Sequence, residues 1–337
     1  MTGVEAAAAL ALLAAAPAAD DRTHDFRYVM GTSISVEVFG GTEAERRDAI
    51  EGAFAAVTEV DRLMSNYRED SELALVNRRA AVEPVRVSDA MLAVLRAAAE
   101  VSLRSGGAFD VTVGPLVRLW GFHDRKPHVP DAAELARVAP LVGYRNVVLD
   151  AAAHTVRFRR PGVELDLGGI AKGFAVELAA GVLRERGLAG SIDAGGNQFV
   201  VGLPPGRTSW SVGIKDPDRP ERILGVVDVA GGSISTSGQY ANALRVGSRS
   251  FGHVLDPRTL QPCDAARSVT VVGPDATLAD ALSKVGMVLG PARGREVIES
   301  FPSMSALIAY RRADGTMAID VSPGLAGRFH PETAGAR

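Results

Sequence analysis

The segment 165–173, LDLGGIAKG, restricts the fold more than any other part of this chain. Apolar residues alternate with polar ones up to Leu167, which predicts a strand over 163–167. The two glycines at 168–169 carry no Cβ and let the backbone turn sharply. From Ile170 onward the apolar residues recur at helical spacing. The segment therefore predicts a strand, a tight turn and a helix whose first N–H groups point back over the turn.

The charged residues of this segment suit an anionic ligand. A helix N-terminus carries partial positive charge, so Lys172 in the first turn is locally unfavourable unless an anion such as phosphate binds there. Asp166 lies on the same rim and is suited to a hydrogen bond with a sugar hydroxyl or to positioning a metal. A glycine turn that packs a helix on a sheet, with Lys172 in solvent, explains the segment equally well. Neither GxGxxG nor the GxxxxGK phosphate loop is present.

The composition indicates a globular protein and excludes several kinds of partner and site. The chain has 337 residues, 47% hydrophobic and 23% charged, enough for one large domain or two smaller ones. The net charge of -3 offers no basic surface, so we expect no nucleic-acid partner. Cys263 is the only cysteine, which excludes an internal disulfide and a thiolate-rich metal site.

The N-terminus resembles an export signal that lacks its usual positive charge. Residues 6–19 are almost all Ala and Leu, too short a run to span a bilayer comfortably, and end like a signal-peptidase site. No Lys or Arg precedes the run, and Glu5 stands where positive charge is expected. We predict an export signal in 1–20 and a periplasmic or cell-envelope location. The alternative is an alanine-rich tail on a cytoplasmic protein.

The remaining pattern predicts an α+β fold. Strands are expected over 32–38, 147–149, 155–158, 198–201, 210–214, 223–229, 268–272, 306–310 and 317–321, and helices over 42–65, 88–104, 277–289 and shortly after Pro130 and Pro291. Strands and helices mix without a regular βαβ alternation, which favours a single domain with largely antiparallel sheet over 26–322. The end of the chain, 323–337, is expected to be a loose tail.

Several clusters outside this segment, all expected in turns, suit a large, flat, phosphorylated ligand. Tyr67 and Phe109 offer rings for stacking. The run 235–237, Ser-Thr-Ser, offers hydroxyls and amides for phosphate oxygens. Lys172 and Arg258 can neutralise a pyrophosphate. Taken singly, each has a plain structural explanation as a core aromatic, a turn or a solvated charge.

Two further residues suit the chemistry of such a ligand. Asp280 is a carboxylate suited to Mg²⁺, which prefers oxygen ligands and bridges phosphates. His253 can take a proton near neutral pH. A place near a helix N-terminus explains Asp280 as well, and a structural hydrogen bond explains His253.

The residues of these clusters and their order along the chain resemble the ApbE-type FAD:protein FMN transferase family over residues 30 to about 290. The most specific pieces are LDLGGIAKG, AGGN at 194–197, STSG-x-Y at 235–240 and H-x-x-DPRT at 253–259. The resemblance implies a single α+β domain related to T-folds, with FAD in a cleft. The FAD contacts it implies are Met30, Tyr67, Ala108, Phe109, Asp110, Asp166, Lys172 and His253, to which the residue types above add Ser237 and Arg258. It also implies metal contacts from the Gly169 carbonyl and Asp280.

The reaction that the resemblance implies is a Mg²⁺-dependent split of the FAD pyrophosphate. A Ser or Thr hydroxyl on a partner redox protein, exported or membrane-associated, attacks the phosphorus on the FMN side, and AMP leaves. Such a step needs neutralised phosphates, a held nucleophile and a proton acceptor. His253 is the candidate base or phosphate contact, and Asp256 is the alternative base.

Two positions depart from the family. Lys284 stands where the family usually has a metal-binding Thr, four residues after Asp280 and so on the same helix face. A charged ammonium cannot ligate Mg²⁺ but can occupy its place electrostatically. Ser283, about 100° around the helix, is the third predicted metal contact, although poorly placed. Leu260 stands where the family usually has Gly. Two alternatives stay open: an FAD pyrophosphatase that uses water, and an FAD-binding protein without turnover.

Overall fold

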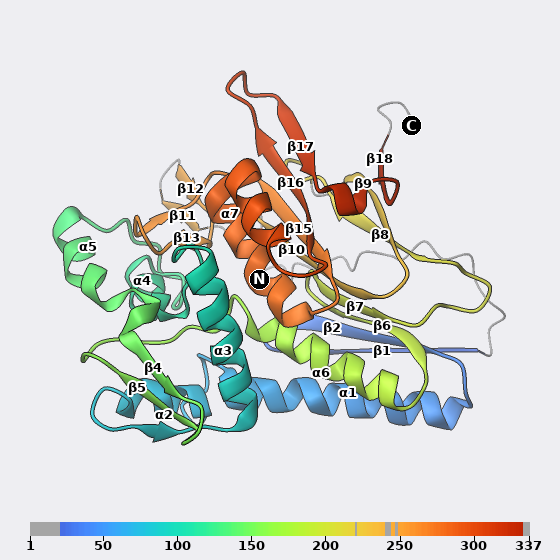
Figure 1. Ribbon diagram of the computed structural model, residues 1–337, viewed down its shortest axis with the longest axis horizontal. Coiled ribbons are helices and arrows are strands. Elements are labelled where there is room, and N and C mark those ends of the chain that lie inside the picture. The colour runs from blue at the N-terminus through green and yellow to red at the C-terminus, as the bar shows by residue number, and fades with distance from the viewer. Residues whose placement is uncertain (1–20, 220, 240–243, 247–248, 333–337) are drawn as a thin grey trace, which may run out of the picture.

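One large antiparallel sheet organises the computed structural model, which describes residues 21–219, 221–239, 244–246 and 249–332 (Figure 1). Its eight strands lie in the order β1 (Arg22–Val29), β2 (Thr32–Phe39), β6 (Ala189–Ala194), β7 (Asn197–Val201), β10 (Gly232–Gly238), β15 (Ser268–Gly273), β16 (Ser305–Arg311) and β17 (Met317–Val321). Every pair of neighbours is antiparallel. The predicted α+β class with largely antiparallel sheet is therefore confirmed.

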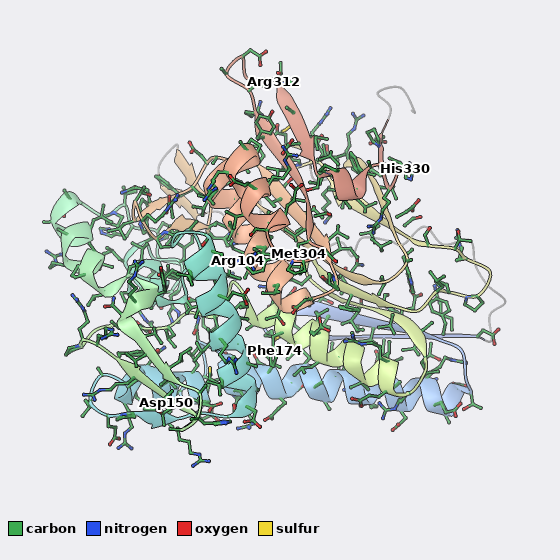
Figure 2. All side chains as sticks on the ribbon, viewed as in Figure 1. Arg104, Asp150, Phe174, Met304, Arg312 and His330 are labelled. Atoms are coloured by element: carbon green, nitrogen blue, oxygen red, sulfur yellow. The ribbon has the colours of Figure 1, made fainter. Side chains whose placement is uncertain are left out.

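Three helices cover one face of this sheet. They are α1 (Glu43–Met64), α6 (Ala171–Glu185) and α7 (Ala276–Glu299). α6 lies between the other two, and each packs on the strands beneath it to form the main hydrophobic core (Figure 1). The helix α3 (Asp89–Arg104) packs against α7. At the end of α3, Arg104 (Figure 2) lies over the Phe301 ring at 3.7 Å and donates to Ser300 Oγ at 3.0 Å, two residues that directly follow α7.

A small sheet closes the other face. Its strands, in the order β18 (Phe329–Pro331), β9 (Ile223–Val229) and β8 (Trp210–Lys215), bury a second apolar cluster. The Trp210 ring meets Phe39 of β2 edge-on at 5.8 Å. The expected loose tail is therefore wrong for residues 323–332: Leu325 is fully buried, and β18 pairs with β9. Residues 333–337 lie outside the described residues.

The remaining elements, apart from the 3-10 turn at 323–325 that packs on β16, surround the end of the large sheet at which α6 begins (Figure 1). The helices are α2 (Glu72–Arg79), α4 (Gly114–Leu119) and α5 (Ala132–Val138), with the short 3-10 turns η1 (Val111–Val113), η2 (Ala139–Leu141), η3 (Tyr144–Asn146) and η4 (Pro323–Leu325). The strands are β3 (Val85–Arg86), β4 (Val147–Asp150), β5 (Thr155–Phe158), β11 (Leu244–Val246), β12 (Arg249–Phe251), β13 (Leu255–Asp256) and β14 (Gln261–Pro262). No helix in the described ranges is both long and apolar enough to cross a bilayer.

Most predicted helices are present because their ends are encoded locally. Thr42 caps α1 in a capping box with Glu45, and Ser88 caps α3. Within α7 the backbone leaves helical geometry at Gly290, where φ is 73°, directly before Pro291. The two helices expected on either side of this point are therefore confirmed as one kinked element.

Two predictions of local structure are wrong. The segment 163–167 is not a strand: Leu165 exchanges two hydrogen bonds with the Asn77 side chain, at 2.8 and 3.0 Å. Its alternation reflects burial, since Val163, Leu165 and Leu167 all lie in the core. The run 235–237 is not a turn but part of the central strand β10, and its place in the sheet ladder excludes a free amide nest. The predicted export signal, 1–20, lies outside the described residues.

Candidate functional site

The site forms where the first turn of α6 meets α7. The Gly173 N–H donates to Asp280 Oδ2 at 2.9 Å, and Asp280 is 0% exposed. A Cβ at Gly173 would lie 2.2 Å from the Ala276 carbonyl oxygen, so only glycine permits this approach of the two helices. Lys172, whose Nζ donates to the Gly168 carbonyl at 3.2 Å, is the neighbouring residue of the same turn. The fold thus brings Asp280 to the predicted anion-binding turn.

Lys284 occupies the other side of the same carboxylate. Its ammonium forms an ion pair with Asp280 Oδ1, one helical turn earlier in α7. Its side chain is 16% exposed and lies beside Gly169, where a Cβ would be 3.9 Å from two of the lysine carbons and 3.2 Å from the Phe109 ring. The structure therefore brings Gly169, Phe109, Asp280 and Lys284 together.

The local charge is positive. Burial lowers the pKa of the Lys284 ammonium; the charge of Asp280 opposes this, and the charge of Lys172 lowers the pKa further. The two ammonium groups are thus close enough to repel each other, while Asp280 supplies one compensating negative charge. An anion beside the first turn of α6 would relieve this repulsion.

The serines near Asp280 form hydrogen bonds within the protein. Ser283 Oγ donates to the Asp280 carbonyl at 2.7 Å and lies 2.7 Å from Ser237 Oγ at the end of β10. Both serines are buried. These hydroxyls join α7 to the central strand, and the structure does not direct them at an open ligand space.

An aromatic stack borders the turn before α6. The Tyr67 ring lies parallel to His123, with 4.9 Å between centroids and 8° between planes, and Tyr67 is 75% exposed. Partial burial raises the pKa of the Tyr67 phenol, and the charge of Asp166 raises it further. Asp166 Oδ1 in turn accepts from the Gly168 N–H at 2.8 Å. Sequence reasoning did not single out His123.

The loop that carries Phe109 is held by a buried carboxylate. Asp110 accepts from the Thr112 backbone at 2.8 Å, from the Thr112 hydroxyl at 2.6 Å and from the Tyr144 backbone. Burial raises the pKa of Asp110, and these hydrogen bonds oppose the rise. Ala108 and Phe109 are both buried beside it. Asp110 therefore positions the loop that places Phe109 against Gly169.

The AGGN segment, 194–197, lies against the turn between β1 and β2. Met30 has a positive φ of 54° and packs partly on the main core. A Cβ at Gly195 would lie 2.5 Å from Thr32 Oγ1, and the Gly196 carbonyl accepts from the Thr236 N–H at 2.8 Å. The AGGN segment thus joins the Met30 turn to the central strand β10.

A third part of the site surrounds the HxxDPRT segment. Arg258 binds Asp256 through two side-chain hydrogen bonds of 2.9 and 2.8 Å, and this pairing raises the pKa of Arg258. A Cβ at Gly107 would lie 3.9 Å from Arg258 Cγ, so this arginine borders the Phe109 loop. His253 lies half-buried just before β13.

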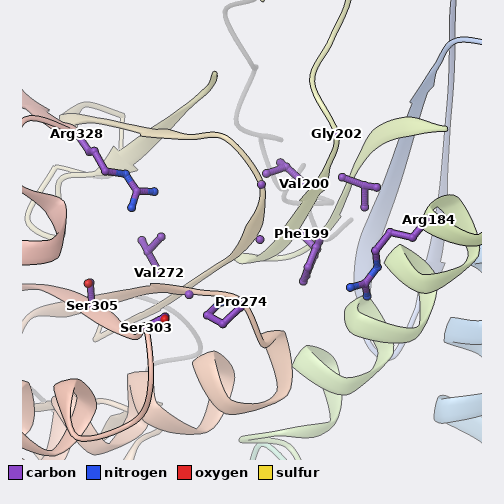
Figure 3. Close-up of a pocket in the computed structure, with 13 residues that line it drawn as sticks. Arg184, Phe199, Val200, Gly202, Val272, Pro274, Ser303, Ser305 and Arg328 are labelled. Atoms are coloured by element: carbon purple, nitrogen blue, oxygen red, sulfur yellow. The ribbon is translucent and has the colours of Figure 1, made fainter. Parts of the chain in front are cut away.

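One cavity lies away from this site. It measures about 510 Å³ and contacts the last turn of α6 through Arg184 and the first residue of β10, Gly232, with Arg328 on its far side (Figure 3). The candidate site instead contacts the first turn of α6 and the last residues of β10. The cavity is therefore at the opposite end of the sheet and takes no part in the site.

The donors near Asp280 do not fit a divalent metal ion. Both carboxylate oxygens of Asp280 have protein partners, Gly173 and Lys284, and the Ser283 hydroxyl is engaged with Ser237. Among the described residues, no three His, Cys, Asp or Glu side chains gather as metal ligands. An ion held by Asp280 would require Lys284 to leave.

Comparison with known proteins finds the same family by sequence and by fold. The model of the ApbE family matches residues 30–308. The chain is 33% identical over 302 residues to the FAD:protein FMN transferase of Treponema pallidum, covering 84% of this chain and 83% of that protein. It is 32% identical over 307 residues to that of Vibrio cholerae, covering 88% and 90%. Its fold is similar to the crystal structure of the ApbE protein from Thermotoga maritima (TM-score 0.84, 30% identity, 92% and 99% coverage) and to the structure of the flavin transferase ApbE from Vibrio cholerae (TM-score 0.82, 30% identity, 91% and 99% coverage).

Proposed function

The chain belongs to the ApbE family and is a flavin transferase, and we propose that it moves FMN from FAD to a Ser or Thr hydroxyl of a partner redox protein with release of AMP. The observation that carries this proposal is the Lys284 ammonium, which is paired with the buried Asp280 and packed beside Gly169 and the Phe109 ring, with Lys172 in the first turn of α6 next to it. Two cations and a helix N-terminus suit a diphosphate. The adjacent ring suits a planar group.

The proposed reaction is a displacement at phosphorus. The acceptor hydroxyl oxygen bonds to the FMN phosphorus, and the bond from that phosphorus to the bridging oxygen breaks. AMP leaves with the bridging oxygen, and the hydroxyl proton passes to a base. AMP is already joined to the FMN phosphate in FAD and serves as the leaving group. The protein therefore contributes mainly by positioning the reactants and supplying positive charge. Lys172 and Lys284 supply positive charge, and the Tyr67–His123 stack offers an aromatic face at the rim.

We assign the base to His253. The base must take the hydroxyl proton near neutral pH, and the imidazole ring of His253 can do so. Asp256, the alternative, is committed to Arg258, and we give this pair the role of holding positive charge near the Phe109 loop. Met30, Ala108, Asp110 and Asp166 complete the proposed FAD site as wall and positioning groups.

A need for Mg²⁺ stays a prediction. A divalent ion would reduce the negative charge of the diphosphate, and the predicted contacts are the Gly169 carbonyl, Asp280 and Ser283. The protein partners of Asp280 and Ser283 speak against an ion held there. The proposed transfer therefore relies on lysine for positive charge at this point.

The test is incubation with FAD and a redox-protein domain that carries a candidate Ser or Thr site. Mass spectrometry of the acceptor should show one added FMN, and denaturing gels should show flavin fluorescence on the acceptor band. Free FMN and AMP without a labelled acceptor would indicate the pyrophosphatase. Bound FAD with neither product would indicate a binding protein, the alternative expected if turnover requires a metal-binding threonine at position 284. Either result would overturn the proposal.

The place of action is a separate proposal. The apolar run in 6–19 supports export to the periplasm or cell envelope, where a membrane-associated acceptor would be accessible. Cell fractionation tests it, and recovery of the full-length chain in the cytoplasm alone would contradict it.

A further inference from the structure

We propose that the Lys284 ammonium is a built-in replacement for a divalent cation, so that this protein binds the FAD diphosphate at Asp280 without a metal ion there. This inference rests on the proposed function, because it names the cation of the same site. It concerns a residue of this chain and predicts a metal requirement that differs from the Mg²⁺ expected from sequence.

Both oxygens of the Asp280 carboxylate have partners within the protein. The carboxylate is fully buried, and its two oxygens are taken by the Gly173 N–H and the Lys284 ammonium. The absence of a Cβ at Gly173 lets the backbone reach the carboxylate, so that oxygen is satisfied by the fold itself. Only the oxygen facing Lys284 could be offered to a metal, and the lysine ammonium already holds it, so a Mg²⁺ ion with its near-octahedral oxygen coordination would have to displace the lysine.

Lys284 lies between the predicted metal contacts Asp280 and Gly169. Its carbon chain packs beside Gly169, the residue whose carbonyl was the other predicted metal contact. A small part of the side chain stays exposed. An ammonium has three N–H donors, and Asp280 takes one, which leaves donors for phosphate oxygens. The lysine thus stands between the buried carboxylate and the glycine turn, where a bridging cation would act.

The charges around Lys284 favour a bound anion over a divalent metal ion. The charged groups that act on Lys284 are Asp280 on α7 and Lys172 on α6. Two ammonium groups and the buried carboxylate leave one net positive charge against the two negative charges of a diphosphate, and the N-terminus of α6 adds partial positive charge. A divalent ion placed beside two ammonium groups would be repelled by both.

The experiment compares metal dependence in wild type and in Lys284→Thr. FAD binding is measured by flavin fluorescence, Mn²⁺ binding by electron paramagnetic resonance, and FMN transfer by labelling of an acceptor, each in EDTA and after metal is added. Wild type should bind FAD equally in both conditions and hold no stoichiometric Mn²⁺. Lys284→Thr frees an Asp280 oxygen and supplies a hydroxyl, so it should bind FAD at least ~10-fold more weakly in EDTA, as expected for a lost charge-assisted contact. Metal should restore its affinity and bind at one ion per chain.

Two control variants separate charge from folding. Lys284→Met keeps the length of the side chain without the charge, and should lose FAD affinity whether or not metal is present. The double variant Asp280→Asn with Lys284→Met removes both charges together and still accepts from Gly173, so it should melt near wild type. A cooperative melt for each variant confirms that binding is read on a folded protein.

The outcomes are distinct. Wild type that loses FAD in EDTA, or that binds one Mn²⁺ per chain, would show that Lys284 moves aside for a metal and would overturn the inference. Wild type that binds no FAD in either condition would overturn it as well. Metal-independent FAD binding without any labelled acceptor would support the inference and refute only the proposed transfer.

Discussion

Replacement of Gly173 by Ala tests the helix contact that builds the site. A Cβ at this position would lie 2.2 Å from the Ala276 carbonyl oxygen and 2.6 Å from the Asp280 Cβ. Backbone atoms cannot swing aside like the tip of a long side chain, so α6 and α7 must separate. That separation also breaks the 2.9 Å hydrogen bond from Gly173 to Asp280.

The expected loss of stability follows from three contributions. Overpacking costs about 1–3 kcal/mol, the lost hydrogen bond to a charged group about 1.5–3 kcal/mol, and alanine regains about 1 kcal/mol of helix propensity. The free energy of unfolding should therefore fall by about 1.5–5 kcal/mol. Urea denaturation followed by far-ultraviolet circular dichroism measures it.

Gly181 provides a matched control in the same helix. A Cβ there would meet no atom within 4 Å, so Gly181→Ala should raise the free energy of unfolding by up to about 1 kcal/mol through helix propensity and a restricted unfolded chain. The reasoning is refuted if Gly173→Ala unfolds at the same urea concentration as Gly181→Ala, because the close approach of α6 to α7 would then be absent.

Three further predictions concern charge and proton binding. Lys172→Met should weaken FAD binding by ~10-fold or more, since it removes one charge-assisted contact; an unchanged fluorescence titration would contradict an anion at α6. Asp256→Asn should lower FAD affinity through the release of Arg258 but leave the pH profile of single-turnover transfer unchanged, whereas His253→Ala should abolish its pH dependence; a profile altered by Asp256→Asn would make Asp256 the base. Burial raises the pKa of the Cys263 thiol from 9.0 to about 12, so its contribution to stability is complete below pH 9 and is lost as the pH rises toward 12. Cys263→Ala should flatten the fall in unfolding free energy over that range, and an equally steep fall would count against this burial.

Predictions from sequence succeeded where the determining contacts are local. The Thr42 and Ser88 caps, the break at Gly290 and the spacing of Asp280 and Lys284 all depend on residues a few positions apart. The start of α6 after the glycine pair belongs to the same class. For these elements the backbone hydrogen bonds and the helix period act within one or two turns, so the sequence contains the whole cause.

Only the tertiary structure decided which of these local pieces are buried and paired. The Ser/Gly-rich run of β10 has no apolar alternation and becomes a central strand because β7 and β15 lie on either side. The alternating 163–167 segment is buried but bonds to a side chain, and the C-terminal residues form β18 because β9 offers a free edge. Above all, Gly173 and Asp280 are distant in sequence and meet because α6 and α7 share one face of the sheet. Local spacing determines conformation, whereas burial and pairing depend on groups that arrive from elsewhere in the chain.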